Sequence, residues 1–78
     1  MRQITIQISS ATAQNLEELA ARCTVAHKHR DGFNSHGPLT VASLISMLAE
    51  DAAMVITRPG SWEGSNMAQV LSSHGYDV

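Results

Sequence analysis

Aromatic residues, cysteine and long apolar runs are all scarce in this chain of 78 residues. The aromatic residues are Phe33, Trp62 and Tyr76, so any core must consist mainly of aliphatic side chains. The single cysteine, Cys23, excludes an intramolecular disulfide and is typical of a reducing compartment. No apolar run approaches the roughly 18 residues that cross a bilayer, and the alternating N-terminus is unlike a secretory signal. These absences predict a cytoplasmic protein.

The chain also lacks a strong charge of either sign. Its formal net charge is −2, which by itself does not indicate a nucleic-acid partner. The charge is uneven, because residues 1–39 carry four basic and three acidic residues, whereas residues 40–78 carry one basic and four acidic residues. A single domain of this length buries little apolar surface on its own, so the sequence favours oligomerisation.

Residues 2–8 alternate strictly between apolar and polar side chains. The apolar positions are Ile4, Ile6 and Ile8, and the polar positions are Gln3, Thr5 and Gln7. This alternation is typical of a strand with one buried face. No second segment of this kind occurs, and a lone strand leaves its backbone groups unpaired. The sequence therefore predicts that the strand pairs antiparallel with the same strand of a second copy, about a two-fold axis.

Three helices are predicted after this segment. The first covers residues 10–23 and is capped by Ser9 or Ser10. The second covers residues 39–56, with Thr40 as N-cap, and the third covers residues 66–73, with Ser65 as N-cap. Apolar residues recur at helical spacing in the first two helices, at Ala13, Leu16, Leu19, Ala20 and Cys23, and at Val41, Leu44, Ile45, Leu48, Ala52, Val55 and Ile56. These stripes are predicted to form the core.

The segment "TVAHKHRDGFNSHGP", residues 24–38, has no apolar periodicity and is predicted to be a long loop. It contains His27, His29 and His36, and it follows Cys23, so its side chains include the types that bind zinc, nickel or copper. A His-x-His pair in a loop is common by chance, and Cys23 fits the apolar stripe. The sequence therefore predicts no metal site and no cofactor.

Catalytic motifs are absent from the sequence. There is no nucleophile with a neighbouring base in a defined context, no glycine-rich loop for phosphate, and no pair of carboxylates on a buried helix face. The chain is therefore predicted not to be an enzyme.

Two stretches, "QITIQISSATAQNLEELA" (residues 3–20) and "GPLTVASLI" (residues 37–45), resemble the ribbon-helix-helix repressors of the Arc, MetJ and CopG type. The resemblance implies a mostly α fold with one N-terminal strand. It also implies an intertwined homodimer, joined by a two-stranded antiparallel intermolecular ribbon. The domain would cover residues 1–58, with a long loop insertion at 24–39 between the helices, and residues 59–78 would form a C-terminal tail.

In this family the ribbon enters the major groove of double-stranded DNA. The resemblance therefore implies base contacts from the polar strand residues, which are Gln3, Thr5 and Gln7. Phosphate contacts would come from the start of the second helix, through Thr40, Val41 and Ala42, and from the nearby cations Arg2, Lys28 and Arg30. The implied function is sequence-specific DNA binding as a homodimeric transcriptional repressor.

Other interpretations stay open at this point. Gln3, Thr5 and Gln7 could simply be the water-exposed face of the strand, with no DNA bound. The loop of residues 24–38 could likewise be a solvent-exposed loop with no binding partner. A second function is a protein-interaction module, such as an antitoxin that binds a toxin through residues 59–78. This tail contains Trp62, Met67, Leu71 and Tyr76.

Overall fold

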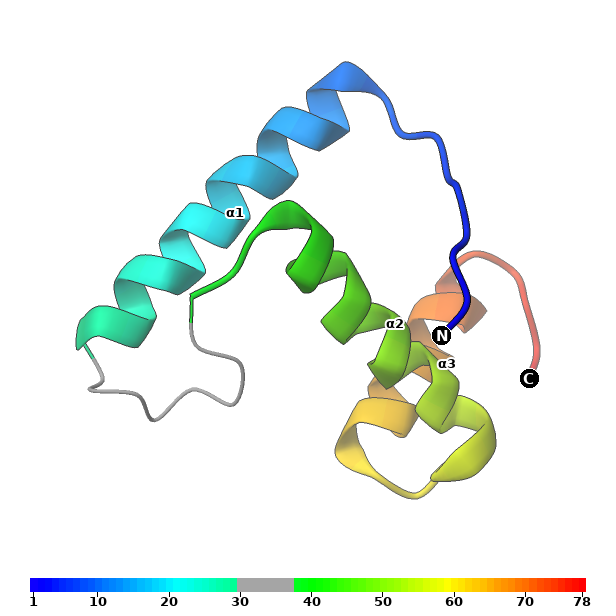
Figure 1. The fold of residues 1–78 in the computed structure, drawn as a ribbon. Helices are drawn as coiled ribbons and strands as arrows, with labels where there is room; N and C mark the ends of the chain where they lie inside the picture. Colours follow the sequence, from blue (N-terminus) through cyan, green and yellow to red (C-terminus); the bar gives the residue numbers. More distant parts are fainter. Residues whose placement is uncertain (30–37) are drawn as a thin grey trace. The chain divides into compact units, whose positions relative to one another are not determined.

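The computed structural model describes residues 1–29 and 38–78 of the chain. Over these residues the chain forms three helices, α1 (Ser10–His29), α2 (Val41–Thr57) and α3 (Trp62–Ser73), as Figure 1 shows. The chain divides into an N-terminal unit, Met1–Leu44, and a C-terminal unit, Ile45–Val78, so that α2 begins in one unit and ends in the other. None of the helices in the described ranges has the length and apolar character needed to cross a membrane.

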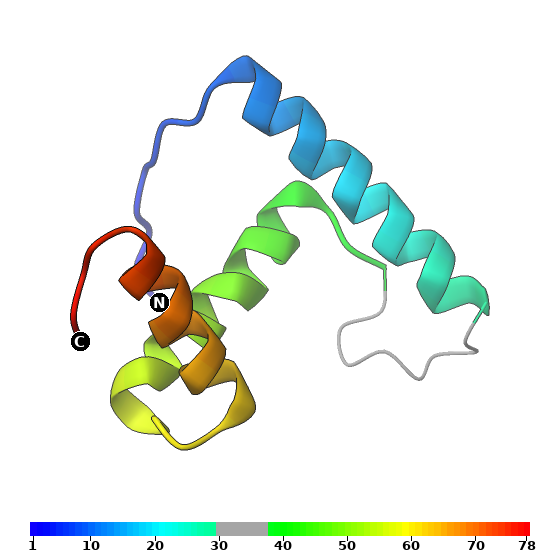
Figure 2. The ribbon, with the colours of Figure 1, turned by 180° about the vertical axis from the view of Figure 1, so that it is seen from behind.

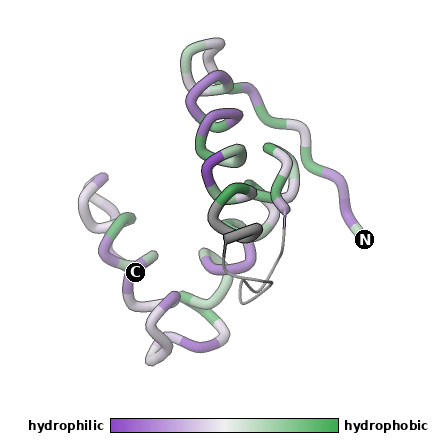
Figure 3. Tube along the Cα trace, turned by 90° about the vertical axis from the view of Figure 1, so that its left-hand side faces the viewer, coloured by the Kyte–Doolittle hydropathy of each residue, from purple (hydrophilic) through white to green (hydrophobic). Residues whose placement is uncertain are grey.

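The predicted N-terminal strand is wrong. Residues 1–9 form neither helix nor strand, and all nine are exposed. Their alternating hydropathy is visible along the N-terminal end of the tube in Figure 3. A strand requires a neighbour that exchanges backbone hydrogen bonds with it, and the described residues of a single chain supply none. The fold over residues 1–29 and 38–78 is therefore all-helical, and the predicted ribbon-helix-helix fold with its intermolecular ribbon is not observed.

The start of α1 is the one that the sequence predicted. The backbone N–H of Thr12 donates to Ser9 Oγ at 3.1 Å, and the N–H of Ala13 donates to the Ser9 carbonyl at 2.9 Å. Ser9 is therefore the N-cap, because its side chain satisfies an N–H group that has no acceptor within the helix.

The end of α1 is later than predicted, at His29 instead of Cys23. Residues 24–29, which were predicted to be loop, are helical. None of them is glycine or proline, so nothing in this stretch interrupts the helix that begins at Ser10, even though no apolar stripe requires it to continue. The Thr24 hydroxyl donates to the Ala20 carbonyl at 3.0 Å and accepts the Leu39 N–H at 3.0 Å. The remainder of the predicted loop, residues 30–37, lies outside the described residues.

The start of α2 is held by a reciprocal pair of hydrogen bonds. The Ser43 N–H donates to Thr40 Oγ1 at 3.1 Å, and the Thr40 N–H donates to Ser43 Oγ at 2.9 Å. This arrangement is a capping box with serine at its third helical position. The predicted N-cap, Thr40, is confirmed, and the helix begins at Val41 and not at residue 39.

The predicted core is largely uncovered. Ala20 and Leu44 are the buried apolar residues of the described chain, with 3% and 2% of their surfaces exposed. Several members of the two apolar stripes are exposed, namely Leu19, Leu48, Ala52 and Ile56. A single copy therefore leaves much of its apolar surface in water, which agrees with the small burial expected of so short a chain.

In the C-terminal unit, a tight turn at residues 58–61 leads from α2 into α3, as Figure 2 shows from behind. The hydroxyl of Ser61 accepts the Gly64 N–H at 3.0 Å and donates to the Arg58 carbonyl at 2.7 Å. Ser61 is thus the N-cap of α3, and the predicted cap at Ser65 and helix start at residue 66 are wrong. The helix begins earlier because the turn at Pro59 and Gly60 ends directly at a residue that can cap it.

Gly64 lets the first turn of α3 lie against the last turn of α2. A Cβ atom at this buried position would lie 2.6 Å from the Arg58 carbonyl oxygen and 2.8 Å from that of Met54. Both distances are shorter than real Cβ contacts, and backbone oxygens cannot rotate away. Only glycine fits this position without a shift of the backbone.

The end of α3 is a Schellman motif. The N–H of Gly75 donates to the Ser72 carbonyl at 2.9 Å, and the N–H of Tyr76 donates to the Leu71 carbonyl at 3.0 Å. Gly75 has a φ of 90°, in the left-handed region that this motif requires. The motif reverses the chain and brings Tyr76, Asp77 and Val78 next to the last turns of α3.

Candidate nucleic-acid interface

The side chains predicted to read DNA bases are accessible. Gln3, Thr5 and Gln7 belong to the exposed segment 1–9, together with Arg2. The intervening isoleucines are uncovered as well, with Ile4 83%, Ile6 58% and Ile8 44% exposed. The segment therefore presents hydrogen-bonding groups that can meet base edges, and apolar groups that need a cover.

The start of α2 has the chemistry of an anion site. The Thr40 side chain satisfies the Ser43 N–H, whereas the N–H groups of the first two helical residues have no acceptor within the helix. Those residues are Val41, which is half-buried, and Ala42, which is exposed. Their N–H groups lie at the positive end of the helix dipole, where a phosphate is favoured.

A contact that the sequence did not predict fixes this helix start relative to α1. The Thr24 hydroxyl, in α1, accepts the Leu39 N–H at 3.0 Å, while its single proton is donated to the Ala20 carbonyl at 3.0 Å. Leu39 is the residue before the N-cap Thr40, so this link holds the entry to α2 within the N-terminal unit. It was missed because Thr24 was assigned to a loop, and no pattern in the sequence pairs Thr24 with Leu39.

The predicted cations are only partly described. Arg2 is exposed. Lys28 belongs to the last turn of α1 and not to a loop, and Arg30 lies outside the described residues. A further cation, Arg22, pairs with Glu18 at 2.8 Å on the exposed side of α1. Such a pair contributes only about 0.3–0.5 kcal/mol to stability, so the pairing does not keep Arg22 from phosphate.

The histidine-rich segment lies at the end of α1 and beyond it. His27 and His29 belong to the end of α1, and His36 lies outside the described residues. Cys23 is a free, half-buried thiol. Among the side chains of residues 1–25 and 38–78, no three metal-binding groups gather in one place. The prediction that the chain holds no metal stays a prediction.

Comparisons with known proteins identify no relative: no family model matches this chain, and neither a curated protein nor a solved structure matches it.

Proposed function

We propose that this chain is a cytoplasmic transcriptional repressor that binds double-stranded DNA as a homodimer and catalyses no reaction. The observation that carries the proposal is the exposed N-terminal segment. Its glutamine and threonine side chains suit base edges, and its isoleucines need a cover.

Association of two copies follows from the apolar surface of the N-terminal unit. Three isoleucines in nine residues are exposed, and Leu19 and Val25 of α1 are exposed as well. Complete burial of such a side chain contributes about 1.5–3 kcal/mol. A second copy supplies an equal apolar surface at the same concentration, and a symmetric contact uses each residue twice.

The polar side chains of the same segment favour DNA as the ligand. Glutamine makes two hydrogen bonds to N6 and N7 of adenine, and threonine hydrogen-bonds to a base or places its methyl group against that of thymine. A symmetric dimer presents Gln3, Thr5 and Gln7 twice. The preferred target would therefore consist of two inverted half-sites with adenine and thymine at the contacted positions.

Phosphate binding would supply most of the affinity that is independent of sequence. Arg2 lies beside the base-reading residues, and the N–H groups of Val41 and Ala42 start α2. Lys28, in the last turn of α1, and Arg30, the first residue after α1 in the sequence, add two positive charges. The net charge of the chain is −2, so the acidic residues repel DNA and the local positive charges must outweigh that repulsion. Because salt screens the attraction between these positive charges and phosphate, binding should weaken steeply as salt is added.

A fluorescence anisotropy titration of a labelled random-sequence duplex, at low and at moderate salt, tests the proposal. We expect binding at low salt that weakens as salt is added. On a panel of single-base variants of a selected target, Gln7→Ala should reduce discrimination at one symmetric pair of positions by about 1–3 kcal/mol.

Gln69→Ala is the matched control, because Gln69 is also an exposed glutamine but belongs to the C-terminal unit. It should leave every base preference unchanged. Absence of binding at the lowest salt would refute DNA binding. Unchanged base preferences in Gln7→Ala would refute the assignment of the N-terminal segment as the element that reads the sequence.

A further inference from the structure

Thr24 joins α1 to the start of α2 through a single hydroxyl group. The hydroxyl donates to the Ala20 carbonyl at 3.0 Å and accepts the Leu39 N–H at 3.0 Å, and both bonds are partly buried. Many helical threonines donate to the carbonyl four residues earlier. The second bond is different, because its two ends lie 15 residues apart in the sequence. A hydroxyl that donates one bond is also a better acceptor for another.

Leu39 is tied to α2, so a bond to Leu39 acts on the whole helix start. Leu39 directly precedes the N-cap Thr40, and Leu44 is the fourth residue of α2. Apolar residues at these two positions form a hydrophobic staple, which fixes the angle at which the chain enters a helix. Here Leu39 is half-buried and Leu44 is buried. The bond that holds Leu39 on α1 therefore also holds the first turn of α2 there.

This link places two parts of the proposed interface relative to one another. Residues 1–9, which contain the base-reading side chains, lead into α1 through the N-cap Ser9. The N–H groups of Val41 and Ala42 start α2. DNA has to meet both parts at once, and a preformed arrangement avoids the cost of ordering one of them during binding.

We propose that Thr24 is a positioning residue of the DNA interface, because its hydroxyl holds the start of α2 on α1. This role rests on the proposed function, since it concerns how the same chain binds DNA. Thr24 itself contacts neither base nor phosphate in this role. Its loss should therefore weaken binding to all sequences alike and leave the choice of bases unchanged.

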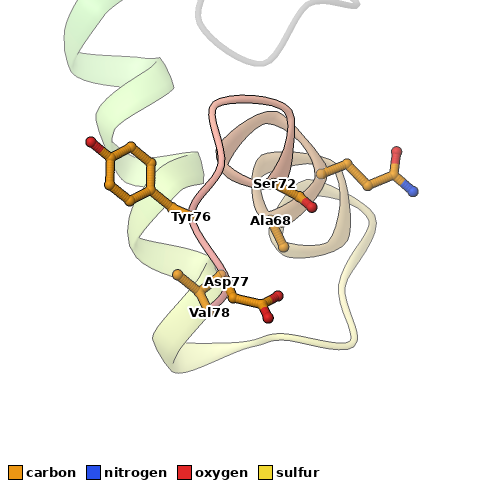
Figure 4. A pocket seen from close by; sticks show the side chains of 6 residues that line it. Ala68, Ser72, Tyr76, Asp77 and Val78 are labelled. Carbon is orange, nitrogen blue, oxygen red and sulfur yellow. The ribbon is translucent and has the colours of Figure 1, made fainter.

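A recess of about 230 Å³ at the end of α3 is the alternative place for a phosphate, and it belongs to the C-terminal unit. Its lining includes Gln69, Ser72 and Asp77, and Figure 4 shows the carboxylate of Asp77. A carboxylate repels a phosphate at short range. The recess therefore does not favour DNA, and a substitution in the C-terminal unit is a suitable control.

Exchange of the Thr24 hydroxyl for a methyl group tests the role. Thr24→Val keeps the shape of the side chain but removes both hydrogen bonds, whereas Thr24→Ser keeps the hydroxyl. One hydrogen bond is worth roughly two- to tenfold in an equilibrium constant. We expect Thr24→Val to weaken binding of the labelled random-sequence duplex by about fivefold, with equal losses on every single-base variant of the selected target. Thr24→Ser should bind within about twofold of the parent chain.

Thr57→Val is the matched control. The Thr57 hydroxyl donates to the Ala53 carbonyl, four residues earlier, at 3.4 Å in the C-terminal unit. The substitution thus removes the same kind of helical bond, and it should change duplex affinity by less than about twofold. Circular dichroism verifies that each variant keeps its helices.

Amide hydrogen exchange of the full chain, followed by NMR, measures the link itself. The Leu39 N–H should exchange about fivefold faster in Thr24→Val than in the parent chain, and at the parent rate in Thr24→Ser. Saturation of the parent chain with duplex should slow this exchange, because DNA binds the linked state better and coupling is reciprocal. This last measurement needs no variant, so it tests the role even if Thr24→Val does not fold.

Three results would overturn the role of Thr24. They are equal duplex affinities of Thr24→Val and Thr57→Val, a loss in Thr24→Ser as large as that in Thr24→Val, and a Leu39 N–H whose exchange in the parent chain is not slowed by duplex. In all three cases the parent chain still binds DNA, so the proposed function stands. A parent chain that binds no duplex at the lowest salt would refute both.

Discussion

Replacing Gly64 with alanine tests how α3 packs on α2. In an open helix this change would stabilise the protein, because alanine has a helix propensity about 1 kcal/mol better than that of glycine. Here the new methyl group would lie 2.6 Å and 2.8 Å from two backbone carbonyl oxygens, those of Arg58 and Met54. Neither oxygen can rotate away, so the end of α2 and the start of α3 must separate.

The expected magnitude follows from these two contacts. Extra atoms in a closely packed site destabilise proteins by about 1–3 kcal/mol. Separation would also disturb the capping bond from the Gly64 N–H to Ser61 Oγ, which is 3.0 Å long, and the loss of an N-cap is worth about 1 kcal/mol. We expect Gly64→Ala to lower the free energy of unfolding by about 1–3 kcal/mol in spite of the gain in helix propensity. The melting temperature would then fall by roughly 4–8 °C per kcal/mol.

Two other glycines provide matched controls. A Cβ atom at Gly60 meets no atom within 4 Å, so Gly60→Ala should change stability by less than about 0.5 kcal/mol. Gly75 has the same open space but a φ of 90°, so Gly75→Ala should destabilise by about 1–2 kcal/mol through backbone strain alone. Thermal and urea unfolding at one fixed protein concentration, followed by circular dichroism, measures all three variants. If Gly64→Ala is as stable as Gly60→Ala, or more stable than the parent chain, the close approach of α3 to α2 is refuted.

Three further predictions concern the N-terminal unit and its ligands. Thr40→Ala should destabilise the protein by about 1 kcal/mol, because the Ser43 N–H loses its cap, and unfolding curves identical to those of the parent would contradict the capping box. Ile6→Ala should weaken the dimer by about 2–5 kcal/mol, as truncation of a side chain that the second copy covers, and an unchanged dimer dissociation constant would contradict this. Replacing both Lys28 and Arg30 with alanine should weaken DNA binding about equally on all sequences and reduce the salt slope by about one per lost contact; an unchanged slope would show that neither residue contacts phosphate.

Helix starts were the part of the fold that the sequence predicted best. Ser9 and Thr40 act as caps at the predicted positions, because capping is a local interaction between residues close together in the chain. The third cap was misplaced, at Ser65 instead of Ser61, since both serines precede helical residues. What distinguishes them is the close contact of Gly64 with the end of α2, which involves residues up to ten positions away and has no signature in local sequence.

The N-terminal strand failed for a different reason. The alternation in residues 2–8 describes how the side chains would be divided between two faces of a strand, but it does not provide the neighbouring strand. The prediction assigned that neighbour to a second copy, whereas the described single chain contains no strand at all. Similarly, the apolar stripes of α1 and α2 were correctly placed on helices, but only Ala20 and Leu44 became buried. Both cases show that periodicity identifies an apolar face without showing what covers it.

For the candidate interface, the exposure of the predicted base-reading side chains does not test their role. Gln3, Thr5 and Gln7 are exposed, but the isoleucines between them, which were predicted to be buried, are exposed as well. The bond from Leu39 to Thr24, which fixes the start of α2, joins residues on both sides of a segment without apolar periodicity. No pattern in the sequence indicates that these two residues meet.

Sedimentation equilibrium of the chain mixed with one labelled duplex, at low salt, tests the central claim most directly. The chain has a mass of 8.4 kDa. If it is a homodimeric DNA-binding protein, the free protein has twice this mass. When each duplex has bound one dimer, the mass of the labelled species should exceed that of the free duplex by the mass of that dimer. A free protein that stays at 8.4 kDa and folds cooperatively, or a duplex whose mass does not change, would contradict the account.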